Sequence, residues 1–197
     1  MHNAIDQAKH SEASRVRYLT ARERSKFTVR AFATGLFSAL GHSPTIAITG
    51  FEGEALVDPN VLENSSLRVL IRAASLEVSD DIGNQDRQEI NRRMYEEVLE
   101  GDSYPEIVYE CTVASVSKTG EGQYWVALNG ELSLHGVRRA HPVSARVTLA
   151  GDSLRAGGEF SLRQSDYEIK PVSAAGGTVK LKDDLKLTFD ITARKQS

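Results

Sequence analysis

VKLKDDLKLTFDITA, residues 179–193, alternates apolar and polar side chains over almost its whole length. Side chains of a β-strand point alternately to two faces, so this stretch predicts a strand with one apolar and one polar face. Antiparallel sheets that cover a core with one face produce this pattern. The residues that share the apolar phase are Val179, Leu181, Leu185, Leu187, Phe189, Ile191 and Ala193.

The same alternation recurs along the chain and predicts eight long strands. Short glycine-bearing connections such as KTGEGQ (118–123) and AGDSL (150–154) indicate hairpins joined in sequence. As an open sheet, these strands would expose unpaired edges, which closure removes. The sequence therefore predicts an all-β fold, an eight-stranded antiparallel up-and-down barrel with room for packed side chains or one small ligand. The predicted strands cover roughly residues 25–33, 45–57, 66–78, 107–118, 123–135, 138–150, 153–164 and 178–193.

Two local features modify this barrel. In TIAITGFEGEALV (45–57) the apolar phase shifts at Gly50, which predicts a bulge or sharp bend. Between the third and fourth long strands, residues 83–101 predict an α-helix with Asn84 as N-cap and Gly101 at its end. This helix either bridges one end of the barrel or packs on its outside. Its apolar residues at a spacing of four are Ile90, Met94 and Val98.

The composition of the chain predicts its domain organisation and limits the functions that it can have. The 197 residues, 40% hydrophobic and 26% charged, predict one globular domain over 16–197 after a loose arm over 1–15. A net charge of −3 gives no electrostatic reason to bind nucleic acid, and no apolar run approaches the ~20 residues of a membrane span. The polar N-terminal region has no hydrophobic signal segment, so we expect a cytoplasmic protein, with a periplasmic one as the alternative if a leader has been removed. Cys111 is the only cysteine, which excludes an intrachain disulfide.

The chain shows no motif that demands catalysis, a cofactor or a metal. We interpret His42 and His135 as turn residues and His141 as a core residue near a barrel mouth. An enzyme that pairs His141 with Asp183 or another acidic residue is the weaker alternative, and it requires the two side chains to meet in one cleft. Four basic residues are either solvated or placed at a mouth to meet an anionic head group: Arg138, Arg139, Arg163 and Lys170.

Five blocks of sequence, in order between residues 18 and 194, resemble the YceI-like family of polyisoprenoid-binding proteins. They are RSKFTVRAF (24–32), GFEGEALVD (50–58), DRQEINRRMYEEVLEGDSYPEIVYE (86–110), LNGELSLHGVRR (128–139) and GEFSLRQSDYEI (158–169). The resemblance implies a lipocalin-like barrel that binds and does not catalyse. The chain departs from the family at Arg24-Ser25 and Ala31, where members often have His-Ser and a second histidine.

The resemblance implies that the barrel interior carries or sequesters a long apolar lipid of the polyisoprenoid or isoprenoid quinone type. The alternative is a filled barrel that acts as an interaction or assembly module without a lipid ligand. A homodimer is compatible with either function. The expected ligand-binding residues are Val69, Ile71, Val126, Leu128, Phe160, Leu162, Leu187 and Phe189 on the wall, with Ile90, Met94 and Val98 as a lid.

Overall fold

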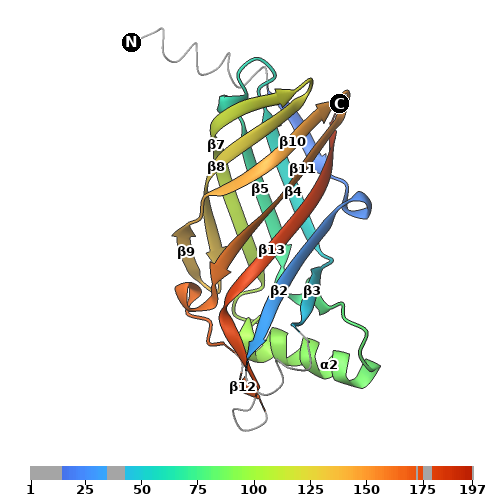
Figure 1. Ribbon diagram of the computed structural model, residues 1–197, viewed down its shortest axis with the longest axis vertical. Helices are drawn as coiled ribbons and strands as arrows, with labels where there is room; N and C mark the ends of the chain where they lie inside the picture. Colours follow the sequence, from blue (N-terminus) through green and yellow to red (C-terminus); the bar gives the residue numbers. More distant parts are fainter. Residues whose placement is uncertain (1–14, 35–42, 172, 175–178, 197) are drawn as a thin grey trace.

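The strands of the computed structural model form one antiparallel sheet that curls until its first and last members pair (Figure 1). The structure describes residues 15–34, 43–171, 173–174 and 179–196. His42 and residues 1–14 of the predicted arm therefore lie outside the described residues. The strands are β1 Val16–Thr20, β2 Lys26–Thr34, β3 Thr45–Ile48, β4 Phe51–Val57, β5 Ser66–Arg72, β6 Leu76–Val78, β7 Glu106–Gly120, β8 Gln123–Leu134, β9 Val137–Ala140, β10 Val143–Ala150, β11 Ser153–Arg163, β12 Ser173–Ala174 and β13 Val179–Lys195.

The predicted eight-stranded antiparallel barrel is confirmed. Strands β1 and β2 together pair with β13 on one side and with β4 and β3 on the other. The ring then continues through β5, β7, β8, β10 and β11 back to β13. Each long strand is therefore the neighbour of the next one in sequence, which is the up-and-down order that the short hairpin connections predict.

The first barrel strand starts earlier than predicted, at Val16 and not near residue 25. A 3-10 turn over Arg22–Arg24 divides it into β1 and β2. At this break the Ser25 hydroxyl accepts a hydrogen bond from the Thr192 amide at 3.0 Å, so β13 stays bound where the backbone ladder is interrupted. The sequence near this break shows too short an alternation to identify β1.

Three other predicted strands are also divided. The strand predicted over 45–57 breaks at Thr49 and Gly50 into β3 and β4. The strand predicted over 138–150 breaks between β9 and β10 at Pro142, which has no N–H for a ladder. The strand predicted over 66–78 contains a 3-10 turn, Ala73–Ser75, beside the bend at Gly50. The Ser75 hydroxyl donates a hydrogen bond to the Gly50 carbonyl at 3.0 Å, and a Cβ on Gly50 would lie 2.7 Å from the Ser75 Cβ. The phase shift in the sequence thus marks a bend shared by two neighbouring strands.

The helix lies across one end of the barrel, the lower end in Figure 1. It comprises α2, Asn84–Arg93, and a π-helical turn over Met94–Val98. The Asn91 side-chain oxygen accepts a hydrogen bond from the Val78 amide at 2.9 Å, which ties the helix to β6. Asn84 is not the N-cap, because Gly83 occupies that position. The helical region ends before Gly101: its last residue is Val98 and its C-cap is Leu99, after which Glu100, with a φ of 46°, breaks the right-handed path.

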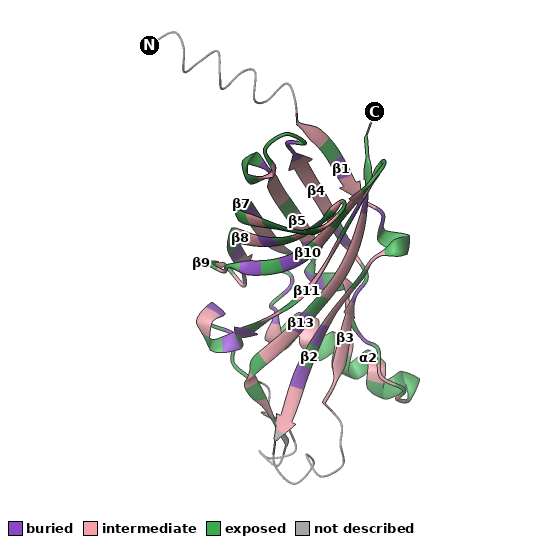
Figure 2. Ribbon diagram, turned by 45° about the horizontal axis from the view of Figure 1, so that its top comes forward, coloured by how far each residue is buried: buried purple, intermediate pink, exposed green. Residues whose placement is uncertain are grey.

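Buried and exposed residues alternate along the strands, as Figure 2 shows. The larger buried cluster reaches from the middle of the barrel to the helix end, where Met94 and Val98 pack against it. A smaller cluster, which includes Tyr18 and Leu154, lies toward the opposite end. No helix in the described part of the chain is both long and apolar enough to cross a membrane.

Candidate functional site

The barrel encloses an apolar cavity of about 460 Å³. Its wall runs from Leu154 and Ala193, in the smaller cluster, to Met94 and Val98 at the helix end. This volume falls within the roughly 300–1,000 Å³ typical of small-molecule pockets. The cavity is the site that can hold an apolar ligand.

All eleven residues that we expected to bind a ligand line this cavity. The wall residues belong to four strands, and the lid residues belong to the helix. Ile90 is 43% exposed, so it lies at the rim, whereas Met94 and Val98 pack inward. That these residues contact a ligand stays a prediction. The wall residues are Val69 and Ile71 on β5, Val126 and Leu128 on β8, Phe160 and Leu162 on β11, and Leu187 and Phe189 on β13.

Aromatic side chains make a larger contribution to the wall than we expected. Phe27 packs edge-on against Phe51, with ring centroids 6.2 Å apart, and against Phe189 at 6.3 Å. Phe160 extends this row, 6.4 Å from Phe189. Phe27 and Phe51 share the apolar phase of their own strands, so the alternation contained the signal that would have identified them.

Tyr109 brings a polar group to the wall and uses it for structure. Its ring lies over Gly130, where a Cβ would be 2.1 Å from the hydroxyl oxygen, and its hydroxyl donates a hydrogen bond to the His141 carbonyl at 3.0 Å. Burial raises the pKa of Tyr109. Burial also raises the pKa of the nearby Cys111 thiol to about 11. Both groups are therefore neutral at physiological pH, and the interior stays uncharged here.

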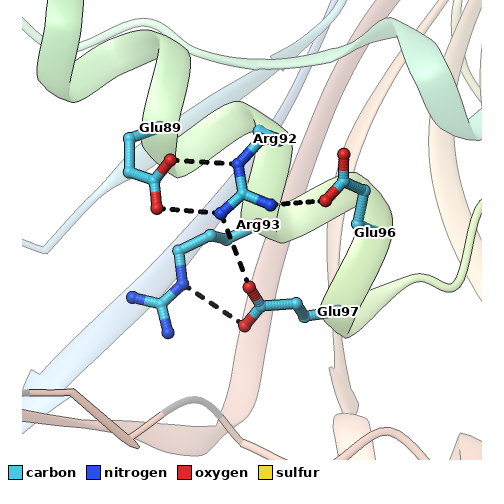
Figure 3. Close-up of polar contacts among 5 residues, drawn as sticks. All are labelled: Glu89, Arg92, Arg93, Glu96 and Glu97. Atoms are coloured by element: carbon cyan, nitrogen blue, oxygen red, sulfur yellow. Dashed lines mark hydrogen bonds and ion pairs between the residues drawn. The ribbon is translucent and has the colours of Figure 1, made fainter.

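Charged side chains cover the helix at the end of the cavity (Figure 3). Arg92 pairs with Glu89 at 2.9 Å and also with Glu96. Arg93 and Glu97, which line the cavity rim, pair with each other at 3.3 Å. Because Arg93 and Glu97 are paired, neither of these two rim residues presents an isolated charge to an apolar chain.

The four basic residues considered for a barrel mouth do not converge on one point. Arg138 pairs with Glu131 at 2.6 Å on the outer face of the sheet. Arg163 and Arg139 line a separate recess between β9 and the end of β11, whereas Lys170 lines neither cavity. The four residues therefore do not form one cationic mouth, although two of them, Arg139 and Arg163, share the recess. Strand pairing, which the sequence does not specify, decides which arginine meets a carboxylate.

The histidines have structural contacts. His135 has a φ of 52° in the turn after β8, and its ring lies 4.6 Å from Tyr104. His141, at the joint of β9 and β10, packs its ring 5.0 Å from Phe160. Asp183 does not meet His141, because it accepts hydrogen bonds from the amide and hydroxyl of Ser165. Within the described ranges, no cluster of His, Cys, Asp and Glu side chains could hold a metal ion.

Several solved structures share the fold of this chain. The chain is similar in structure to a polyisoprenoid binding domain from Saccharophagus degradans, with 14% identity, a TM-score of 0.67, and coverage of 91% of this chain and 98% of that one. It is similar to BcnA of Burkholderia cenocepacia, with 15% identity, a TM-score of 0.66, and coverage of 88% and 98%. It is also similar to the Campylobacter jejuni YCEI protein, with 18% identity, a TM-score of 0.57, and coverage of 77% of this chain and 85% of that one. The TM-scores and the coverage show a shared fold.

No curated protein matches the chain in sequence. The sequence profile of the YceI-like domain, however, matches residues 5–193. This range includes the whole barrel from β1 through most of β13 and contains all five of the sequence blocks described above. The chain belongs to the YceI-like family.

Proposed function

We propose that this protein binds a long apolar lipid, of the polyisoprenoid or isoprenoid quinone type, in the barrel cavity and carries or sequesters it. The observation that supports this function is the 460 Å³ apolar cavity that runs along the barrel. The description of the Saccharophagus degradans neighbour as a polyisoprenoid binding domain supports the same class of ligand.

The physics of an apolar cavity suits this ligand. An isoprenoid chain offers no hydrogen-bonding groups along its length, so burial must supply the affinity. Each buried methylene contributes about 0.8 kcal/mol, and ordering the chain and immobilising the complex oppose this gain. A wall of aliphatic and phenyl side chains provides the contact area without polar groups that would lose hydration.

The cavity also favours binding over the alternative of a filled assembly module, which requires a barrel without space for a chain. Burial keeps Tyr109 and Cys111 protonated, which fits a container better than a centre for acid–base or nucleophilic chemistry. Homodimerisation stays a prediction, and light scattering of the purified protein measures it.

A pair of matched variants tests lipid binding. Leu128→Trp adds bulk inside the cavity, and Asn129→Trp places the same side chain on the outer face of the same strand. We expect wild type and Asn129→Trp to take up geranylgeraniol from aqueous dispersion, and Leu128→Trp to bind it at least tenfold more weakly. Circular dichroism and urea unfolding establish that both variants are folded.

Mass spectrometry of organic extracts completes the test, with the protein purified from its host without detergent. An isoprenoid lipid present in wild type and depleted in Leu128→Trp supports the proposal. Empty wild-type preparations that also take up no geranylgeraniol contradict it. Equal uptake by both tryptophan variants would show that the ligand does not bind in the barrel interior.

A further inference from the structure

The ladder between β10 and β11 contains a gap. Their register ends where Arg146 pairs with Gly157, and Gly158 still lies close to β10, because a Cβ there would be 2.7 Å from the Ser144 carbonyl oxygen. Beyond Gly157, strand β11 pairs with β13 alone. Residues 137–140 pair instead with β8. On the far side of the gap, the His135 Nδ1 lies 3.2 Å from the Tyr167 carbonyl oxygen. We call the region between the Arg146–Gly157 pair and the His135–Tyr167 contact the side window.

The two sides of the side window are held by different neighbours. On one side, the His141 amide donates a hydrogen bond to the Gly130 carbonyl of β8 at 2.7 Å. On the other side, the Gln164 side chain donates to the Lys182 carbonyl of β13 at 3.0 Å. In Figure 1, β9 and the turn that follows β11 lie beside each other at the left edge of the barrel. Each side thus keeps its place without a ladder across the gap.

A recess of about 650 Å³ lies at the side window and adjoins the apolar cavity. Leu162 lines both the recess and the cavity. Phe160 lines the cavity, and its ring packs against His141, which lines the recess. The side chains of these residues therefore separate an apolar interior from a polar pocket.

The charges of the recess balance. Its wall contains two arginines, Arg139 and Arg163, and two aspartates, Asp166 and Asp184. Arg163 and Asp166 already form an ion pair at 3.1 Å. The two carboxylates would repel a diphosphate group, and this repulsion would offset much of its attraction to the arginines. This balance favours an uncharged polar group.

Two side chains of the recess retain hydrogen-bonding capacity. Across the described ranges, neither the Arg139 guanidinium nor the His141 ring nitrogens make a hydrogen bond. Burial lowers the pKa of His141, against the opposite effect of Asp166, so its ring is neutral at pH 7 and can donate one hydrogen bond. At the helix end of the cavity, by contrast, Arg93 and Glu97 are paired with each other.

We propose that the side window holds the polar end of the bound lipid, and that this end is an uncharged hydrogen-bond acceptor such as a hydroxyl or a quinone carbonyl. Arg139 and His141 donate to its oxygen, while the chain extends past Phe160 and Leu162 into the cavity. The inference rests on the proposed function, because the chain must occupy the cavity for its end to reach the recess.

Two isoprenoid probes separate the end group from the chain: geranylgeraniol, which ends in a hydroxyl, and squalene, which has no polar end. Their affinities are measured by displacement of the apolar fluorophore N-phenyl-1-naphthylamine. The variants are Arg139→Ala and His141→Phe, the latter of which keeps an aromatic ring against Phe160. Arg138→Ala is the matched control, because Arg138 neighbours Arg139 and pairs with Glu131 outside the recess.

We expect each recess variant to bind geranylgeraniol about tenfold more weakly, the value of one hydrogen bond, and to bind squalene within twofold of wild type. Arg138→Ala should bind both probes as wild type does. Equal loss of both probes, or no loss of geranylgeraniol, would overturn the side window as the end-group site. Tighter binding of geranylgeranyl diphosphate than of geranylgeraniol would overturn the uncharged end group. If wild type binds neither probe, the proposed function itself fails.

Photo-crosslinking locates the end group directly. Geranylgeraniol with a benzophenone ester at its hydroxyl is bound, irradiated and mapped by peptide mass spectrometry. We expect the label on residues 139–143 or 161–167. A label confined to residues 90–98 of the helix would place the end group at the lid and contradict the inference.

Discussion

The ring of Tyr109 fills the space that a side chain at Gly130 would occupy, since a Cβ there would lie 2.1 Å from the tyrosine oxygen. The two residues lie on adjacent strands, β7 and β8, and Tyr109 lines the cavity. This close approach lets the hydroxyl reach the His141 carbonyl beyond β8. One glycine thus allows the contact that fixes one side of the side window.

Gly130→Ala should therefore destabilise the protein by about 1–3 kcal/mol, because the new methyl group forces the tyrosine ring aside. Gly157→Ala is the control, since a Cβ there would meet only one atom, at 3.6 Å. Urea unfolding measures both. Equal midpoints for the two variants would contradict the close approach at Gly130.

Tyr109→Phe removes the hydrogen bond to His141 and keeps the ring. We expect the free energy of unfolding to fall by about 1 kcal/mol, because the buried carbonyl loses its side-chain donor. Tyr124→Phe provides the comparison: Tyr124 also lines the cavity, and its hydroxyl makes no hydrogen bond with the described residues. A similar loss in both variants would show that the hydroxyl contact adds no stability.

The Cys111 thiol should react slowly and in a pH-dependent way. Only the thiolate is alkylated, and with a pKa of about 11 the thiolate fraction at pH 8 is about one in a thousand. The iodoacetamide rate should therefore rise about tenfold per pH unit from pH 8 to pH 10. Bound geranylgeraniol should slow it further, because Cys111 lines the cavity. A rate at pH 8 equal to that of the urea-unfolded chain would contradict the burial.

The helix should control the rate at which the lipid is taken up. Asn91→Ala removes the acceptor for the Val78 amide, so we expect the free energy of unfolding to fall by about 1 kcal/mol. Because the helix is then held less firmly to β6, the uptake of geranylgeraniol should become severalfold faster. Arg92→Ala is the control, because its ion pairs lie on the exposed face of the helix (Figure 3). Stopped-flow fluorescence measures the rate. Destabilisation without faster uptake would show that the lipid enters by another path.

Much of the fold could be predicted from the alternation of apolar and polar residues along each strand. The residues of the cavity wall could be predicted from the same pattern. A period of two fixes which side chains share a face, so closure of the sheet brings Val69, Leu128 and Phe189 into one interior even though they are far apart in sequence. The phase shift at Gly50 likewise marked a real bend. The pattern within a strand predicts which side chains lie on the inner face of the sheet, and therefore which of them line the cavity.

Relations between strands could not be derived in this way. Arg138 and Arg139 are adjacent and chemically identical, yet they meet different partners across β8. Arg138 lies opposite Ser133 and reaches Glu131 two residues away, whereas Arg139 lies opposite Leu132. The point at which β10 and β11 part depends on how each pairs with its other neighbour. The recess is built from such relations, and no periodic signal in the sequence describes them.

The contact between Ser25 and Thr192 has a consequence for how the protein folds on the ribosome. These residues are 167 positions apart, and they join the first barrel strand to the last. Contacts of such long range form slowly, because the loop between them must close first. A nascent chain that lacks β13 has neither this contact nor the pairing of β1, β2 and β11 with the last strand. The barrel can therefore close only after the final strand has left the exit tunnel, and until then its apolar face is open to chaperones.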